Sequence, residues 1–98
     1  MNRAYYAVFY AANAALATVN EARGKHSGVI SAFRERFVKT GTIETEYSRI
    51  YGRLMDDRHS ADYELARTPT PDEVRRDVED AERFVNRLET YLGEAGWL

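Results

Sequence analysis

The stretch AYYAVFYAANAALA (residues 4–17) decides the fold class of this chain. Asn13 is its one polar residue if tyrosine is counted as apolar. A helix that is apolar on every side is normally buried on every side. We therefore expect residues 2–22 to form the central helix of an all-α bundle. Three further helices are a thin cover, so we also expect a preceding helix or a second subunit to complete it.

Two more helices are predicted from apolar residues at helical spacing. In the second helix we expect Ser27 to be the N-cap and Gly41 to end the helix. Its buried face comprises Val29, Ile30, Phe33 and Phe37. The third helix covers residues 43–65, and its buried stripe comprises Tyr47, Ile50, Tyr51, Leu54, Arg58, Ala61 and Leu65.

The fourth helix has the clearest start signal. Thr70 is placed as its N-cap, Pro71 as its first residue, and two acidic residues follow at the positive end of the helix dipole. Its expected buried seam comprises Val74, Val78, Ala81, Val85, Leu88 and Leu92. Short connections between the helices predict one domain over residues 1–98, an antiparallel up-and-down four-helix bundle.

Composition excludes several kinds of function. The chain has 14 basic and 16 acidic residues and a net charge of −2, which argues against an overall field that attracts nucleic acid but leaves a local basic cleft open. Cysteine is absent from the sequence, so disulfides and thiol catalysis are excluded. With His26 and His59 as the only histidines, we expect no metal site and no cofactor. No signal peptide or membrane span is visible, so we expect a cytoplasmic protein.

The segment RLMDDRHSADY (residues 53–63) places a dense group of charges on the third helix. Arg58 lies in the apolar stripe, and Asp62 follows four residues later on the same face. A buried charge is costly unless it is paired. Arg58 and Asp62 therefore form either an internal pair that sets helix register or an arginine held toward a cleft, where it would bind a phosphate or carboxylate.

Three other residues of this segment are candidates for chemistry. His59 is either a partly exposed, hydrogen-bonded histidine or a general acid or base. Arg53 is either a surface ion pair with the aspartates that follow it or a phosphate contact. Tyr63 is either a core or rim aromatic, or a residue that stacks on a base or offers its hydroxyl for modification.

His26 and Ser27 stand at the expected start of the second helix. They either pack beside the cap or place hydrogen-bond donors at a helix N-terminus, where anions bind favourably. We therefore include both as candidate binding residues.

Four stretches occur in this order in one known family: NRAYYAVFYAA (2–12), KHSGVISAF (25–33), FVKTG (37–41) and DRHSADYE (57–64). Together they resemble the HEPN domain (higher eukaryotes and prokaryotes nucleotide-binding). The similarity is greatest to the small standalone prokaryotic proteins often encoded beside a minimal nucleotidyltransferase. The resemblance covers nearly the whole chain and implies an all-α, commonly dimeric bundle. It also implies a further N-terminal helix, which has no counterpart in this sequence.

The resemblance implies two functions. Many HEPN proteins are toxins and metal-independent endoribonucleases, whose signature is an arginine followed at short spacing by a histidine. Arg53 and His59 match that signature, and Tyr63 follows, so catalysis is expected from Arg53, Arg58 and His59. The alternative is a non-catalytic nucleotide-binding or adaptor subunit of the same module, because this branch has an element resembling Arg58-x-x-Ala61-Asp62-Tyr63. The implied partners are a second copy, the nucleotidyltransferase, and RNA or a nucleotide.

Overall fold

The computed structural model describes residues 3–63 and 70–98, and over residues 58–63 it describes the backbone alone. These ranges hold four α-helices and no strand: α1 (Arg3–Thr18), α2 (His26–Phe33), α3 (Thr45–Tyr63) and α4 (Pro71–Glu94). A π-helical turn, η1 (Arg34–Val38), continues α2. The predicted all-α fold class is confirmed.

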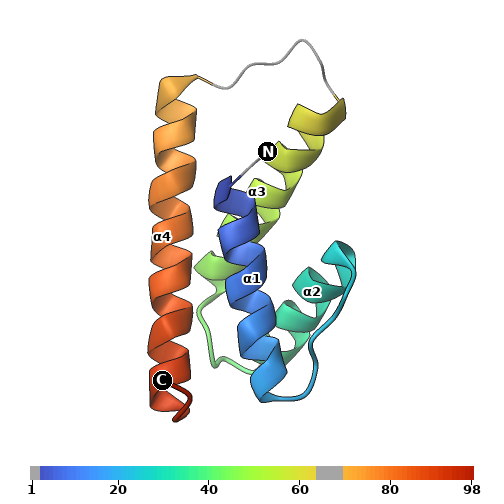
Figure 1. Ribbon diagram of the computed structural model, residues 1–98, viewed down its shortest axis with the longest axis vertical. Coiled ribbons are helices and arrows are strands. Elements are labelled where there is room, and N and C mark those ends of the chain that lie inside the picture. Colours follow the sequence, from blue (N-terminus) through green and yellow to red (C-terminus); the bar gives the residue numbers. More distant parts are fainter. Residues whose placement is uncertain (1–2, 64–69) are drawn as a thin grey trace.

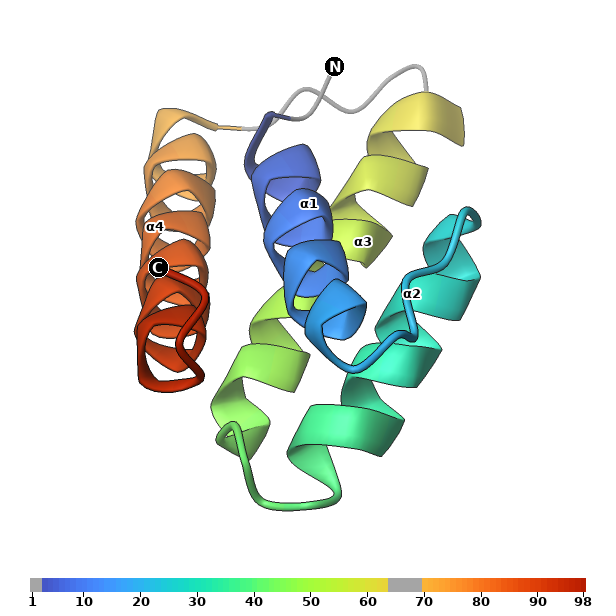
Figure 2. The same cartoon turned by 60° about the horizontal axis from the view of Figure 1, so that its bottom comes forward.

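The helices pack around α1, which lies between α2 and α4 with α3 behind it (Figures 1 and 2). Tyr5 contacts His26 at the starts of α1 and α2, and Glu21 pairs with Arg36 beyond their ends, at 2.5 Å. These two helices therefore run in the same direction, because the connection over residues 19–25 returns along α1. This differs from the expected alternation of direction, whereas α3 and α4 are antiparallel as predicted.

The core is a single apolar cluster to which all four helices contribute. The predicted face of the second helix is confirmed, because Val29, Ile30, Phe33 and Phe37 are all buried. Ile50, Tyr51 and Leu54 of α3 are also buried as predicted. The rest of the buried cluster comprises Tyr5, Val8, Phe9, Ala12, Ala15, Leu16, Ile43, Ala81, Phe84 and Leu88.

The described helices of this one chain bury the first helix on its inner sides only, and the further cover that the sequence predicts stays a prediction. The outer face of α1, formed by Ala7, Tyr10, Ala14 and Ala17, is exposed in this structure. The other described helices contact α1 on its inner sides, so part of the apolar surface of α1 stays exposed to solvent. Tyr10 is 65% exposed.

The predicted seam of α4 is partly wrong. Ala81 and Leu88 are buried, but the inward position between them belongs to Phe84 and not to Val85. Val74 and Val78 are each 46% exposed. The first turns of α4 extend beyond the start of α1 (Figure 1), so they have less of the core to pack against.

Two of the predicted helix signals are confirmed. The Thr70 side chain accepts a hydrogen bond from the Glu73 backbone, and the Glu73 side chain accepts one from the Thr70 backbone, which completes a capping box before Pro71. Gly41 has φ +78°, the left-handed conformation that glycine adopts without strain after a helix.

Candidate functional site

Helix α3 carries most of the residues to which the sequence assigns chemistry. Arg53 lies near its middle, and Arg58, His59, Asp62 and Tyr63 follow in its last turns. The backbone of all five is helical, so Arg58 and Asp62 are one turn apart. The side chains of the last four lie outside the described part of the structure. Their expected roles stay predictions.

Arg53 makes ion pairs with aspartates of two helices. Its guanidinium donates hydrogen bonds to Asp77 and, at 2.5 Å, to Asp80, both on α4. A third carboxylate, that of Asp57, lies one turn further along α3 at 3.5 Å. Three carboxylates therefore surround one guanidinium, and the cluster ties α3 to α4.

The electrostatics of Arg53 follow from these partners. Partial burial by itself lowers the pKa of Arg53, but the hydrogen bond to Asp77 and the charges of Asp77, Asp80 and Asp57 raise it overall. The side chain is 29% exposed, so the pairs are only partly screened by water. Negative charge exceeds positive charge here, which disfavours binding of a phosphate at Arg53 unless the aspartates move away.

His26, the first residue of α2, packs against aromatic side chains of α1. The Tyr5 hydroxyl lies 2.5 Å from His26 Nδ1, within hydrogen-bond distance. The imidazole stacks on Phe9 with ring centroids 4.4 Å apart and 12° between the planes. Tyr6 meets it edge-on at 5.8 Å. The imidazole is half-buried, whereas Tyr5 is fully buried.

Ser27 does not cap the second helix, so that prediction is wrong. The helix begins at His26, its N-cap is Lys25 in an extended conformation, and no side chain caps it. The contacts of His26 with Tyr5 and Phe9 place His26 against α1, and the helix starts from that residue. Ser27 lies inside the first turn and is exposed.

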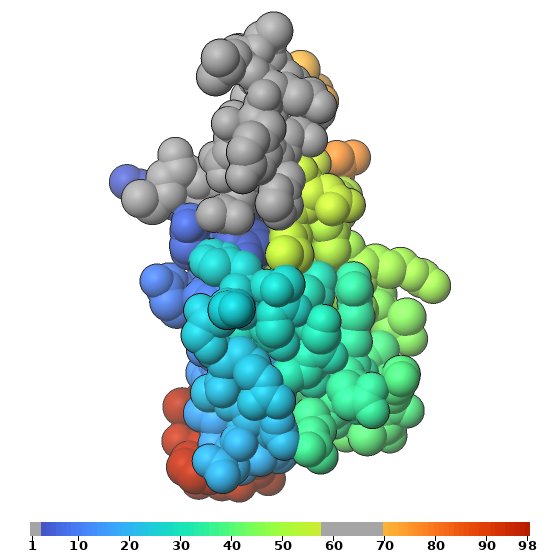
Figure 3. Space-filling view, turned by 90° about the vertical axis from the view of Figure 1, so that its right-hand side faces the viewer, coloured from blue at the N-terminus to red at the C-terminus, as the bar shows by residue number. Residues whose placement is uncertain are grey.

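The start of α2 lies beside α3, as Figure 3 shows on the face that the two helices share. Tyr5 contacts a residue of each helix. Its ring centroid lies 5.5 Å from that of His26 on α2 and 6.3 Å from that of Tyr51 on α3. Tyr51 is fully buried, and its hydroxyl has no hydrogen-bond partner in the described part of the protein. Burial raises the pKa of this phenol, and Tyr5 raises it further, whereas Arg34 lowers it.

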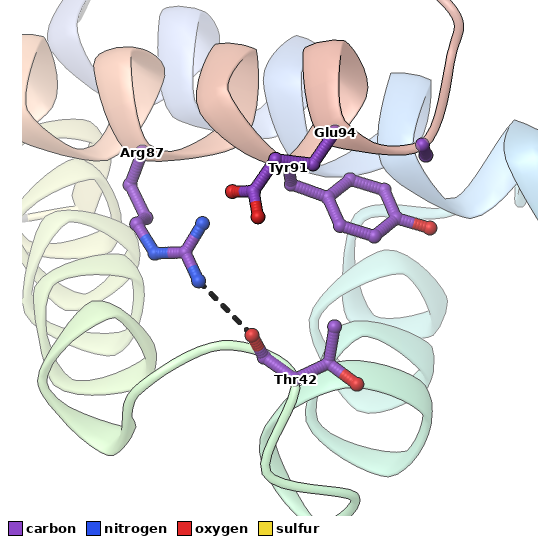
Figure 4. A pocket seen from close by; sticks show the side chains of 5 residues that line it. Thr42, Arg87, Tyr91 and Glu94 are labelled. Atoms are coloured by element: carbon purple, nitrogen blue, oxygen red, sulfur yellow. Dashed lines mark hydrogen bonds between the residues drawn. The ribbon is translucent and has the colours of Figure 1, made fainter.

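An open pocket lies elsewhere, at the other end of the bundle (Figure 4). It is lined by Thr42, Arg87, Tyr91, Glu94 and Ala95. Arg87 donates to the Thr42 carbonyl at 3.0 Å and to Glu44 at 2.7 Å, which lowers the pKa of Glu44. None of the candidate residues from the sequence lines this pocket, and its arginine already has these acceptors.

In the described residues, neither a group of metal-binding side chains nor a membrane-spanning helix was found. Among residues 3–57 and 70–98, no three His, Asp or Glu side chains are grouped to hold a metal ion. In the described helices, no segment combines the length and the apolar character that crossing a membrane needs.

Sequence reasoning anticipated that Arg53 could pair with the aspartates that follow it, and Asp57 is such a partner. It missed the partners of Arg53 on α4 and the contact of His26 with Tyr5. Asp77 and Asp80 lie three residues apart on α4, a spacing that places them on one helix face and could have suggested a shared partner. Tyr5 gave no such signal, because a tyrosine in an apolar run is ordinarily a core residue. Its contact with His26 depends on the packing of α1 against α2.

Comparison with known proteins gives a family match. The HEPN domain matches residues 1–91. A UPF0332 protein of Thermotoga maritima is 36% identical over 92 residues, which cover 94% of this chain and 70% of that protein. A Methanocaldococcus jannaschii protein named "Putative toxin MJ0605" is 42% identical over 92 residues, covering 94% of this chain and 68% of its own. No solved structure matches the chain significantly.

Proposed function

Because the chain belongs to the HEPN domain family, we propose that it is the toxin of a toxin–antitoxin module and cleaves RNA in the cytoplasm without a metal ion. The observation that carries this proposal is similarity over 94% of the chain to relatives whose names contain the word toxin. The position of Arg53 and His59 on one continuous helix supports it, because that pair matches the family's nuclease signature.

The proposed reaction is transfer of a phosphodiester to the neighbouring ribose hydroxyl. His59 removes the 2′-hydroxyl proton or protonates the departing 5′ oxygen. Arg58, one position earlier on α3, stabilises the charge that builds on the phosphate oxygens. A homodimer would place two copies of His59 near one substrate, and these copies would supply the acid and the base.

The proposed antitoxin is a minimal nucleotidyltransferase. Transfer of a nucleotide from a nucleoside triphosphate to the Tyr63 hydroxyl, with pyrophosphate as the leaving group, would add bulk and negative charge one turn beyond His59 on α3. That addition would block access of an RNA phosphate to the same helix end. Asp62 would hold Arg58 in place during the reaction.

A second candidate function is favoured by the ion pairs of Arg53. That guanidinium already has carboxylate partners on α3 and α4, which leaves it poorly suited to stabilise a phosphate. The alternative is therefore a non-catalytic nucleotide-binding or adaptor subunit of the same module. In that function Arg58, Asp62 and Tyr63 hold a nucleotide or dock the nucleotidyltransferase.

Cleavage of a fluorescent single-stranded oligoribonucleotide in the presence of EDTA tests the proposal. We expect cleavage by the wild-type protein, and a loss of roughly 10²–10⁴-fold in kcat for His59→Ala, the range typical of an acid–base residue. Arg75→Ala is the matched control. It removes a charge from an exposed side chain of α4, and we expect it to cleave like wild type.

The opposite result distinguishes the second function. If wild type leaves RNA intact with and without EDTA, the nuclease proposal fails. The adaptor function then predicts that Arg58→Ala abolishes binding of a nucleotide or of the nucleotidyltransferase, whereas His59→Ala retains it. Isothermal titration calorimetry of both variants measures this difference.

A further inference from the structure

Arg34, the first residue of η1, is held across the surface of α3 by two residues of that helix. Its Nε donates a hydrogen bond at 2.8 Å to the Oγ atom of Ser48, a buried side chain. Its Nη2 lies beside Gly52, where an added Cβ atom would be only 2.9 Å from it. The absence of a side chain at Gly52 therefore lets the guanidinium lie close to the helix backbone. Arg34 is exposed, and its contacts with α3 set its orientation.

The charge of Arg34 is not neutralised within the described part of the protein. Apart from the bond to Ser48, Arg34 makes no hydrogen bond or ion pair there, so its two terminal nitrogens have no acceptor. Two such nitrogens in one plane match two oxygens of a phosphate. Six other arginines of the described residues pair with carboxylates: Arg23, Arg36, Arg53, Arg75, Arg83 and Arg87.

A second arginine without a carboxylate partner lies next to this position. Arg49 follows Ser48 on α3, is exposed, and makes no ion pair in the described part of the chain. Residues three apart on a helix are neighbours on its surface, so Arg49 adjoins Gly52. Asp56, one turn beyond Gly52, is exposed and forms no ion pair with Arg34. Two arginines against one aspartate give this side of α3 a net positive charge, whereas the carboxylates around the middle of α3 face α4.

We propose that Arg34 binds a backbone phosphate of single-stranded RNA. Ser48 and Gly52 set its orientation, and Arg49 adds positive charge beside it. The inference rests on RNA as the substrate in the proposed function, and it adds a binding residue that takes no part in proton transfer. Gly52 lies roughly 10 Å along α3 from the backbone of His59, so a strand of a few nucleotides that follows the helix would reach both positions.

Binding of RNA that cannot be cleaved separates this role from catalysis. A fluorescein-labelled single-stranded oligoribonucleotide with 2′-O-methyl groups throughout lacks the hydroxyl that the proposed reaction needs. Fluorescence anisotropy gives its dissociation constant from about 50 to about 200 mM KCl. The test variant is Arg34→Gln. The matched control is Arg36→Gln, which removes the same charge from an exposed arginine that already pairs with Glu21.

We expect Arg34→Gln to weaken RNA binding roughly three- to tenfold, as the loss of a charged, hydrogen-bonded contact does. The slope of log K against log salt concentration should become less steep by about 0.7, the value for one phosphate of a single strand. Arg36→Gln should stay within about twofold of wild type.

Gly52→Ala tests the geometry while it keeps every charge. The added Cβ displaces the guanidinium of Arg34, so we expect this variant to weaken RNA binding as well. Its melting temperature should equal or exceed that of wild type, because alanine favours a helix more than glycine does. If Arg34→Gln does not fold, as judged by thermal melting, Gly52→Ala decides the question alone, and unchanged binding then excludes the role.

Two further outcomes overturn the inference. If Arg34→Gln and Gly52→Ala both bind RNA like wild type, Arg34 only ties η1 to α3 or serves a protein carboxylate. If Arg36→Gln weakens binding as much as Arg34→Gln, the RNA responds to overall charge and not to this position.

The cleavage assay keeps this inference distinct from the proposed function. If wild type cleaves unmodified RNA but the Arg34 variant binds like wild type, only the inference fails. If binding depends on Arg34 but wild type does not cleave, the phosphate contact is supported and catalysis fails. If wild type neither binds the methylated RNA nor cleaves unmodified RNA, both fail.

Discussion

Tyr51 combines a fully buried ring with a hydroxyl that lacks a partner in the described part of the protein. An unsatisfied buried hydroxyl costs free energy, because it gave up hydrogen bonds to water on folding. Burial also raises the pKa of this phenol above its ordinary value of 10.0. Because the pKa of Tyr51 is higher in the folded state than in the unfolded state, the free energy of unfolding keeps its full value below pH 10. Above pH 10 the free energy of unfolding falls, because the phenol ionises first in the unfolded chain.

We predict that Tyr51→Phe raises the free energy of unfolding at pH 7 by about 1 kcal/mol. At pH 11 its advantage over wild type should grow by roughly 1.4 kcal/mol, the effect of one proton over one pH unit. Urea denaturation followed by circular dichroism at both pH values measures this. Tyr10→Phe, at a hydroxyl that is mostly in water, should match wild type. A Tyr51→Phe variant less stable than wild type at pH 7 would show that the hydroxyl is satisfied.

At the scale of elements, α3 and α4 are connected by charge as well as by the core. Arg53 pairs with Asp77 and Asp80 across the two helices, and their side chains are only 15–29% exposed. For ion pairs of this kind, the net contribution to stability differs from the cost of removing one partner. Their net contribution is small, but removal of the cation alone leaves carboxylates close together with reduced access to water.

We therefore predict that Arg53→Met destabilises the protein by roughly 1–3 kcal/mol in urea denaturation at low salt. Arg75→Met is the control, since its pair with Asp72 is exposed and should contribute less than about 1 kcal/mol. The variant Arg53→Met, Asp77→Asn, Asp80→Asn should recover part of the loss. Equal stability of Arg53→Met and Arg75→Met would show that the cluster does not connect the helices energetically.

At the scale of the whole molecule, the chain has a small core and an uncovered apolar face on α1. A chain of 98 residues buries a modest fraction of its surface, so association with a second copy would add a useful share of stability. The family resemblance implies a dimer, and the proposed chemistry uses one. The exposed Ala7, Tyr10, Ala14 and Ala17 are consistent with a need for further cover.

We predict that the melting temperature rises with protein concentration. A hundredfold increase should stabilise a dimer by about 2.7 kcal/mol, which corresponds to several degrees. Differential scanning calorimetry at both concentrations measures the shift, and sedimentation velocity at the same concentrations gives the mass. A melting temperature independent of concentration, together with the mass of one chain, would exclude the homodimer.

The sequence by itself determined the helices, the N-cap of α4 and most of the core. The capping box at Thr70, the left-handed Gly41 and the buried face of α2 with η1 depend on contacts within a few residues, which spacing reveals. It also placed Arg53, Arg58 and His59 on one helix, because that placement requires only helical continuity.

The tertiary structure alone decided which face of α4 is buried and which groups meet. Phe84 and not Val85 points inward because the choice depends on the shape of the helices opposite. Arg53 meets Asp77 and Asp80 across 24 and 27 residues, and Tyr5 meets His26 across 21. Helical periodicity reports which side of a helix a residue occupies. The partner on the other side depends on how whole helices pack, and that is a property of the assembled bundle.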